Sequence, residues 1–312
     1  MAFADSGKEG AVLAPMASFT DAPFRLLAER FGALWTVGEM VMSRSLLEGA
    51  SAARELLRLH PRERSRVVQL AGSDPEEVAA AAALVRESVG PRAIDLNMGC
   101  PMPKVTARGA GAALLDDPER AARMVRLLRQ ATGLPVSVKL RLGYERENAL
   151  EVALALEEAG AALLRIHGRT ARQRYQGRAD WGRIAAIAAA VSLPVVGTGD
   201  VRSVRDYREK RGLGLGVAIA RGALGRPWIF AEVRGVVVGG AEKKQAALEH
   251  LRLHLSWYAH KGEAWALRAF RGHLKSYLAA APEEARRRAL ASLEVAAVAA
   301  ALERWVGEEA EV

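Results

Sequence analysis

The sequence of 312 residues has a single cysteine, Cys100, so it can form neither an internal disulfide nor a zinc site built from cysteines. This scarcity is typical of a reducing compartment, and we expect a cytoplasmic protein. No apolar run approaches the roughly 18 residues that a membrane-spanning helix needs, and residues 1–10 lack the apolar core of a signal peptide. Neither a G-x-G-x-x-G fingerprint nor a P-loop occurs, which argues against Rossmann and Walker nucleotide sites.

Lysine and asparagine are also scarce, with eight lysines and only two asparagines, Asn97 and Asn148. Arginine therefore supplies 37 of the 45 basic residues, and the formal net charge is +9. Because arginine forks suit phosphates and nucleobases, this composition favours a nucleic-acid partner. A GC-rich or thermophilic source would give a similar bias, so composition alone leaves both explanations open.

Eight short apolar runs alternate with amphipathic segments, and half of all residues are hydrophobic, enough to bury a full core. An Asp followed by a Pro opens three of the amphipathic segments, as at a helix N-terminus. Eight such units predict an α/β fold of the (β/α)8 TIM-barrel type, with a doubly wound open sheet as the alternative. The runs cover residues 11–16, 34–40, 66–72, 93–99, 135–141, 162–168, 194–199 and 216–222.

The pattern changes from Lys243 onward, where strand-like runs disappear and three apolar stripes at helical spacing predict three helices. We therefore expect a catalytic barrel over residues 1–238 and a small helical domain over residues 239–312. The stripes consist of Leu248, Leu251 and Leu255, of Leu267, Phe270, Leu274 and Leu278, and of Leu290, Leu293, Ala297, Ala301 and Trp305.

Polar residues and glycines end several apolar runs, and in a TIM barrel these positions line the active site. Residues 198–200 and 220–222 follow the last two runs, where barrels commonly bind phosphate through free backbone N–H groups. Lys139 could form a Schiff base or hold an electron-rich ring, and Gln69 offers a donor and an acceptor to a planar heterocycle. Together these features suggest a phosphorylated redox ring such as FMN.

Cys100 stands between Gly99 and Pro101, directly after the fourth run. A lone cysteine is most often a buried small hydrophobe, but this loop context argues against burial. Because a thiol is mostly protonated at neutral pH, Cys100 is a candidate general acid. A nucleophilic role would need a neighbouring base, which the sequence does not mark.

Eight stretches of the sequence resemble the tRNA-dihydrouridine synthase family, flavoenzymes that reduce uridine in tRNA. They run in the family's order across the whole barrel, and HLSWYAHKG (254–262) and FRGHLKSYL (270–278) in the helical part also look like that family. The third and sixth stretches are the most specific. In chain order they are APMASFTDAPFR (14–25), VQLAGSDPE (68–76), DLNMGCPMPKV (95–105), GAGAALL (109–115), SVKLRLG (137–143), IHGRTARQRYQGRADW (166–181), VVGTGDV (195–201) and ARGALGRPWIF (220–230).

The resemblance implies roles for individual residues. Cys100 would donate a proton, Asn97 would contact the target uracil, and His167 would lie where flavin and substrate meet. The family usually has Asn at position 198 and Gly at position 220, so Thr198 and Ala220 would bind phosphate through backbone N–H groups. The implied FMN-binding residues are Pro15, Met16, Ala17, Gln69, Lys139, His167, Thr198, Gly199, Asp200, Ala220 and Arg221.

The activity that the resemblance implies is reduction of the C5–C6 double bond of specific tRNA uridines, by default in the D-loop. Reduced FMN would deliver a hydride to C6, Cys100 would protonate C5, and NADPH would reduce the flavin again. Hydrogen bonds to the uracil carbonyls should stabilise the developing enolate. The target base must leave its stack to reach a barrel mouth.

Two segments concentrate the positive charge. Residues 165–178 hold five arginines and no acid, with Tyr175 interleaved, which suits RNA phosphates and unstacked bases. Residues 243–275 hold seven lysines and arginines against two acids. We expect both segments, and Arg108 beside Cys100, to contact tRNA. The expected substrate contacts are Asn97, Lys104, Arg141, Arg169, Arg174, Arg178, Arg268, Arg271 and Lys275.

Two other functions compete with this interpretation. One is an FMN barrel oxidoreductase that acts on a free pyrimidine, and the other is a non-catalytic RNA-binding barrel. We expect no metal and no membrane association, and a monomer. Glu39, at the end of the second run, could position substrate or order a neighbouring arginine.

Overall fold

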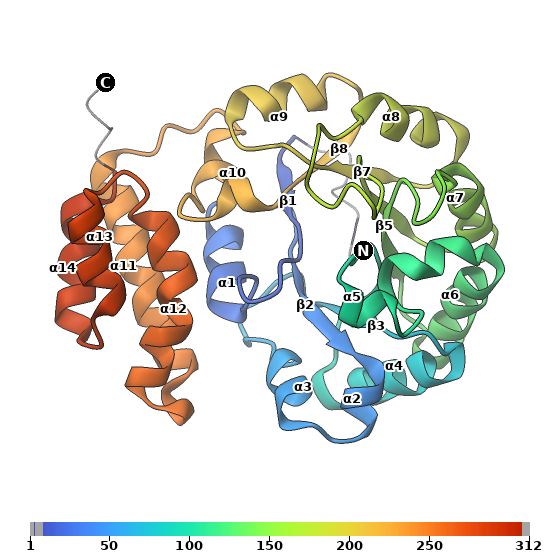
Figure 1. The fold of residues 1–312 in the computed structure, drawn as a ribbon, viewed down its shortest axis with the longest axis horizontal. Coiled ribbons are helices and arrows are strands. Elements are labelled where there is room, and N and C mark those ends of the chain that lie inside the picture. Colours follow the sequence, from blue (N-terminus) through green and yellow to red (C-terminus); the bar gives the residue numbers. More distant parts are fainter. Residues whose placement is uncertain (1–2, 4–8, 308–312) are drawn as a thin grey trace.

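The computed structural model describes Phe3 and residues 9–307, and a ring of eight parallel strands forms its centre (Figure 1). Neighbouring strands pair from β2 to β8, and β8 pairs with β1. A bridge between Leu13 and Thr36 closes the ring, so the predicted TIM barrel is confirmed. The strands are β1 (Ala11–Leu13), β2 (Val37–Met42), β3 (Val67–Ala71), β4 (Ala93–Met98), β5 (Val136–Arg141), β6 (Leu163–His167), β7 (Val195–Thr198) and β8 (Gly216–Ile219).

Helices surround the ring, and their ends follow the predicted signals (Figure 1). The side chains of Asp21, Asp74 and Asp117 cap α1, α4 and α6 by accepting backbone N–H groups. Gly90 and Gly133 end α4 and α6 in the left-handed conformation. The helices of this part are α1 (Ala22–Arg30), α2 (Ser43–Leu47), α3 (Ser51–Leu56), α4 (Pro75–Val89), α5 (Pro103–Thr106), η1 (Gly111–Asp116), α6 (Pro118–Thr132), α7 (Ala149–Glu158), α8 (Trp181–Ala190), α9 (Val204–Arg211), η2 (Arg221–Ala223) and α10 (Ile229–Glu232).

Two hydrophobic clusters lie on the two faces of the sheet. The larger one packs the outer faces of the strands against the surrounding helices. The smaller one fills one end of the barrel interior, where Trp35 meets Phe3 edge to face at 5.1 Å between ring centroids. Because strand residues alternate between the two faces, the remaining inward positions belong to other residues. These positions carry polar side chains.

A separate helical bundle lies beside α1 and α10 (Figure 1). It contains α11 (Gly240–Trp257), η3 (Ala259–Lys261), α12 (Glu263–Tyr277), α13 (Glu283–Ala291) and α14 (Val295–Trp305). The expected third helix is in fact two helices, α13 and α14. The chain is extended at Ser292, and Leu293 is 40% exposed between them, so the apolar spacing continued across a break. Among the described residues, no helix combines the length and apolarity that a membrane crossing requires.

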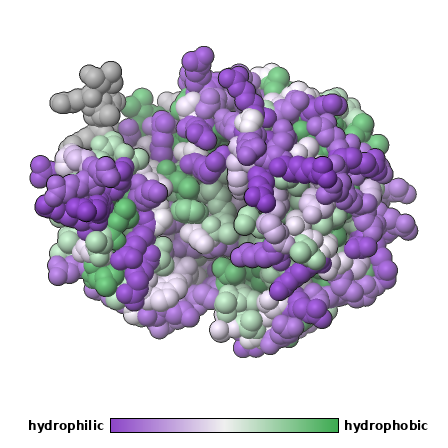
Figure 2. Space-filling model, viewed as in Figure 1, coloured by the Kyte–Doolittle hydropathy of each residue, from purple (hydrophilic) through white to green (hydrophobic). Residues whose placement is uncertain are grey.

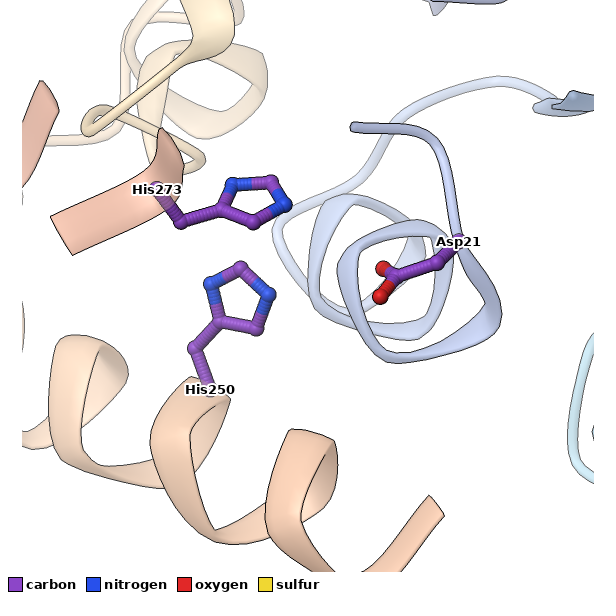
Figure 3. Close-up of side chains that lie close together, drawn as sticks. All are labelled: Asp21, His250 and His273. Carbon is purple, nitrogen blue, oxygen red and sulfur yellow. The ribbon is translucent and has the colours of Figure 1, made fainter. Parts of the chain in front are cut away.

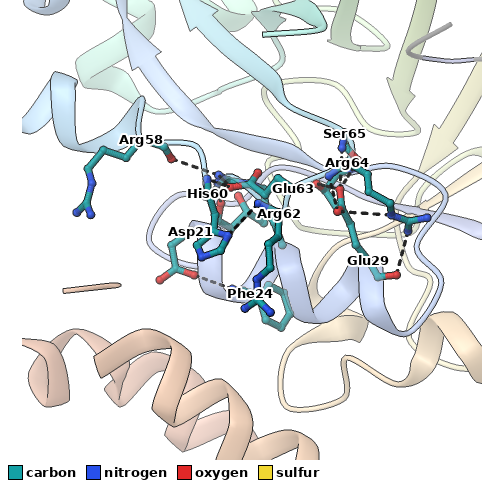
Figure 4. A network of polar contacts seen from close by, with 12 residues as sticks. Asp21, Phe24, Glu29, Arg58, His60, Arg62, Glu63, Arg64 and Ser65 are labelled. Carbon is teal, nitrogen blue, oxygen red and sulfur yellow. Dashed lines mark hydrogen bonds and ion pairs between the residues drawn. The ribbon is translucent and has the colours of Figure 1, made fainter. Parts of the chain in front are cut away.

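Two buried carboxylates fasten the segment before β3 to α1 (Figure 4). Glu29 accepts the backbone N–H groups of Arg64 (2.8 Å) and Ser65 (2.9 Å). Glu63 accepts two hydrogen bonds of 2.8 Å from the Arg25 guanidinium. These charge-assisted bonds fix the entry into β3.

The loop after β8 approaches α12 so closely that only glycine fits at position 225. A Cβ on Gly225 would lie 2.4 Å from the carbonyl carbon and oxygen of Ser276, and the residue has a φ of 69°. The backbone of the barrel thus touches the backbone of the bundle directly. Small residues at such a contact set the distance between two elements.

We expect Gly225→Ala to lower the free energy of unfolding by about 3 kcal/mol, because backbone strain adds to displacement of α12. Gly214→Ala is the matched control, since its φ of 77° is similar but nothing lies within 4 Å of the added Cβ. It should cost about 1 kcal/mol. Urea denaturation measures both values, and equal losses would contradict the close contact.

Candidate functional site

The barrel interior contains a layer of buried polar side chains above its apolar end. Asp95 of β4 is fully buried and accepts hydrogen bonds from Gln69 Nε2 (2.6 Å) and Ser137 Oγ (2.5 Å). Arg165 of β6 is also fully buried and forms an ion pair with the same carboxylate. Since a buried charge is costly without partners, four strands cooperate to satisfy one carboxylate. Asp95 and Ser137 were not among the residues predicted for the site. The only sign of them in the sequence is a polar residue at alternate positions of apolar runs.

A hydrogen-bond chain leads from this layer to Cys100. Asn97 donates its amide Nδ2 to Gln69 Oε1 (2.8 Å), and its Oδ1 accepts the N–H groups of Gly99 (3.2 Å) and Cys100 (3.0 Å). The Cys100 thiol is free and partly exposed. The orientation of the cysteine loop therefore depends on Gln69 and Asn97. From the sequence, Gln69 is expected to contact the flavin and Asn97 the uracil.

Cations outnumber carboxylates beside this loop. Arg165 and Arg169 each have a carboxylate partner. Lys139 and Arg141, in contrast, have no ion pair among the described residues. Burial lowers the pKa of Lys139 to about 7, and repulsion from Arg141 and Arg165 adds to the effect. Burial together with Lys139 and three arginines holds the pKa of His167 far below its usual range. Within the described part of the chain, the Lys139 ammonium has no hydrogen bond or ion pair and His167 Nδ1 is a buried atom without a partner. The site can therefore accept an anion that would relieve this repulsion.

The two loops predicted to bind phosphate lie against each other. A Cβ on Gly222 would lie 2.4 Å from the carbonyl oxygen of Val201, so this pair requires a glycine. Arg221 and Gly222 begin η2, and the first N–H groups of a helix lack intrahelical partners. The Asp200 carboxylate points elsewhere: it binds Arg169 (2.7 Å) and the Ala179 N–H (2.8 Å). Thr198 is buried, and Ala220 is partly buried against the hydrophobic cluster of the barrel interior.

Two arginines of the expected RNA segment 165–178, Arg165 and Arg169, are internal, so the prediction of a surface role is corrected for them. Arg141, expected to contact the substrate, is also buried. Arg165 is the partner of Asp95 inside the barrel. Arg169 is 2% exposed, and its guanidinium binds Asp200 and the carbonyls of Gln176 and Gly177. Arg141, 3% exposed, donates to the carbonyls of Gly99 (2.8 Å), Thr170 (3.0 Å) and Arg174 (2.9 Å). These side chains hold the loops around Cys100 in place.

Other expected cations do lie at the surface. Lys104, Arg174 and Arg178 are exposed, and the side chain of Tyr175 is 58% exposed. On α12, Arg268 and Lys275 are exposed and Arg271 is half-buried. Within the described ranges, none of these six cations belongs to an ion pair. The helix stands near the barrel mouth, because a Cβ on Gly272 would lie 2.9 Å from the Phe19 ring in the loop after β1.

The loop after β1 carries Pro15 and Met16, both partly buried, and Ala17, which is exposed. Ser18 follows in the left-handed conformation and donates its N–H to the carboxylate of Glu39. Glu39 lies inside β2, which continues to Met42, and not at the expected strand end. Burial raises the pKa of Glu39 to about 7. In this structure Glu39 holds the Pro15–Ala17 loop.

Seen from the side of Figure 1, hydrophilic residues cover the rim of the molecule, while less hydrophilic surface gathers over the centre of the strand ring (Figure 2). A barrel with two glycine-containing loops, several buried cations and one thiol at the strand ends has the features of a TIM-barrel enzyme whose active site lies at the strand ends.

The chain belongs to the dihydrouridine synthase family, whose model, described as "Dihydrouridine synthase (Dus)", matches residues 12–309. It is 41% identical to a probable tRNA-dihydrouridine synthase from Rhizobium leguminosarum bv. phaseoli, covering 86% of this chain and 84% of the relative. It is 40% identical to tRNA-dihydrouridine synthase B from Pseudomonas putida, covering 87% and 83%. A solved 2-naphthoyl-CoA reductase complex shares the fold, at 11% identity and a TM-score of 0.53, covering 73% of this chain and 50% of that one.

The buried carboxylate predicts a specific double-mutant result. Arg165→Met should lower the free energy of unfolding by about 3–5 kcal/mol, because it leaves the Asp95 charge without its cation. Adding Asp95→Asn removes that charge, so the double variant should be more stable than Arg165→Met alone. Denaturant titration of the four proteins measures the coupling. Strictly additive losses would show that the two side chains act independently.

Proposed function

We propose that this protein reduces uridines of tRNA to 5,6-dihydrouridine, with FMN as bound cofactor and NADPH as reductant. The observation that carries this proposal is the excess of cations over carboxylates around the strand ends, with the only thiol of the chain beside them. These cations form an anion-binding site, suited to a phosphorylated cofactor, next to the Cys100 thiol as proton donor. Family membership supports the same reaction.

The residues present fit FMN. Orphaned N–H groups of Arg221 and Gly222 at η2 suit a phosphate, and the Lys139 ammonium offers a donor that nothing else in the described chain uses. Bound FMN would supply the hydride for uracil C6. Gln69 already uses both ends of its amide within the protein, so its contact to a flavin would require sharing or exchanging a hydrogen bond. Thr198, Gly199 and Ala220 would line the cofactor.

The chain's own residues would then position the base and supply the proton. Cys100 would protonate C5, while Asn97 and Arg141 fix the cysteine loop from opposite sides. Lys139, with its lowered pKa, can donate a hydrogen bond or a proton near neutral pH. His167 stays neutral, so it would contact a ligand as an uncharged donor or acceptor.

The exposed cations would bind the tRNA backbone. Lys104 lies in the segment after β4 and Arg174 and Arg178 in the loop after β6, while Arg268, Arg271 and Lys275 lie on α12 near the loop after β1. Tyr175, exposed and 4.8 Å from the Arg221 guanidinium carbon to its ring centroid, could stack on an unpaired base. We therefore assign tRNA binding to residues 239–312 together with these barrel loops. We propose that the reduced uridines lie in the D-loop of the tRNA.

We further propose that the protein acts as a monomer in the cytoplasm. The free thiol of Cys100 supports a reducing compartment. A non-catalytic RNA-binding barrel would not explain the buried cations of the barrel interior. An enzyme that acts on a free pyrimidine would not explain the unpaired cations of α12.

Replacing the thiol tests the proton donor. Cys100→Ala should lower the rate of dihydrouridine formation by about 10²–10⁴-fold, the usual contribution of a general acid. The yellow flavin absorbance of the purified protein should remain. Mass spectrometry of tRNA from a strain lacking the gene, incubated with each protein and NADPH, measures the gain of two hydrogens per uridine. Full turnover by the variant would refute the assignment, and a colourless wild-type protein would refute the cofactor.

Charge reversal on α12 tests the tRNA surface. Arg268→Glu with Lys275→Glu should weaken tRNA binding at least tenfold and flatten the salt dependence by about one to two units of slope, because phosphate contacts are lost. The matched control reverses Arg205 and Arg208, two exposed arginines of the outer helix α9. Binding titrations over a range of salt concentrations measure both. Equal effects of the two pairs would show a nonspecific response to net charge.

A further inference from the structure

A buried group of metal-type ligands lies where the barrel meets the helical bundle. Asp21 immediately precedes α1, His250 belongs to α11 and His273 to α12, and the three side chains point toward one another (Figure 3). One ligand atom from each lies within 4.8 Å of the other two. Their exposed fractions are 8%, 0% and 1%. The cluster lies outside the site described above.

Several histidine nitrogens in this cluster lack hydrogen-bond partners. His250 Nε2 and both ring nitrogens of His273 are buried atoms with no hydrogen-bond partner among the described residues, and so is Nε2 of the adjacent His254. A neutral imidazole has one N–H donor and one acceptor nitrogen. Leaving such groups buried and unpaired costs about 1–3 kcal/mol each. Several of them in one place need an explanation.

Aromatic packing explains why the histidine rings are buried, but not why their polar nitrogens are buried with them. His250 stacks on Phe24 with 5.4 Å between centroids, and His273 lies 4.9 Å from the same ring. Apolar rings at these places would pack equally well without buried polar atoms. The packing does, however, provide an apolar shell, which is the common surrounding of a structural metal site.

Side chains next to the cluster can hold the proposed ligands in position. His250 Nδ1 lies 3.1 Å from the Tyr277 hydroxyl, which can fix the tautomer that leaves the Nε2 lone pair toward the cluster. His254 Nδ1 lies 3.1 Å from Asp21 Oδ2, so it can orient the carboxylate. One Asp21 oxygen, Oδ1, also accepts the Phe24 N–H at 3.1 Å. Each proposed ligand except His273 thus has a second partner that holds it.

The chemistry of the three side chains also suits a metal. A neutral histidine ring can offer the lone pair of one nitrogen, and an aspartate can offer a carboxylate oxygen. Two imidazoles and one carboxylate form the donor set that binds zinc in many proteins.

We propose that Asp21, His250 and His273 bind a divalent ion of the zinc type, with water in the fourth position. The donors would have to approach to about 3.4 Å from one another to form a tetrahedral site with bonds of about 2.1 Å. Such an ion would join α1 of the barrel to α11 and α12 of the bundle, and so would set the orientation of the cations on α12 relative to the mouth. This inference departs from the sequence-based expectation of a protein without metal.

Equilibrium dialysis of the full-length protein against micromolar zinc chloride tests the site. We expect the wild type to bind one zinc ion per chain, and Asp21→Asn and His273→Gln to lose it. Asn is as good a helix N-cap as Asp, so Asp21→Asn removes the charge and keeps the cap of α1. His260→Gln, an exposed histidine of the same bundle, and Cys100→Ala should both keep the ion.

Thermal unfolding with and without zinc gives a second measurement. The ion should raise the Tm of the wild type and His260→Gln, because binding to the folded state alone stabilises it, and should leave the Tm of Asp21→Asn unchanged. Absence of zinc from the dialysed wild type, or equal binding by Asp21→Asn and the wild type, would overturn the proposal. Zinc retention and dihydrouridine formation are measured separately, so failure of one does not decide the other.

Discussion

The Asp95 carboxylate is the buried charge around which the interior of this barrel is organised. It has no exposure to solvent, so its cost of burial must be offset by partners from neighbouring strands: Gln69, Ser137 and Arg165. Gln69 in turn holds Asn97, and Asn97 holds the Cys100 loop. The same interactions that satisfy a buried charge therefore position the Cys100 loop. The ends of a hydrogen-bond chain like this one cannot move independently.

The site combines this rigid support with electrostatic repulsion. Lys139, Arg141 and His167 all have lowered pKa values, chiefly through burial and then through neighbouring cations. The chain holds these groups together through its backbone and loop contacts, so the arrangement exists before any anion binds. Such preorganisation costs stability in the free protein and strengthens binding of the ligand that neutralises it.

The sequence predicted much of the fold, because the fold rests on local signals. Continuous apolar runs marked all eight strands, and Asp21, Asp74 and Asp117 marked helix starts that the structure confirms. The boundary between α13 and α14 was missed, because the apolar spacing continues through the exposed Leu293. Motifs singled out Cys100, Asn97 and Lys139, but nothing in a motif told which arginines face inward. The sequence pattern predicted that Arg165 and Arg169 are surface cations. In the structure, Arg165 pairs with Asp95 inside the barrel and Arg169 pairs with Asp200.

By itself, the sequence determined the barrel, the added helices and the neighbourhood of the thiol, since periodicity, caps and motif order are properties of adjacent residues. Only the tertiary structure decided which charges are paired. Asp95 and Arg165 are 70 positions apart, and Asp21 and His273 still farther, yet each pair meets inside the protein. Pairing between distant side chains depends on how strands register and helices pack, and no local pattern records it. The group of cationic side chains in the barrel interior and the histidine cluster between barrel and bundle both result from that packing.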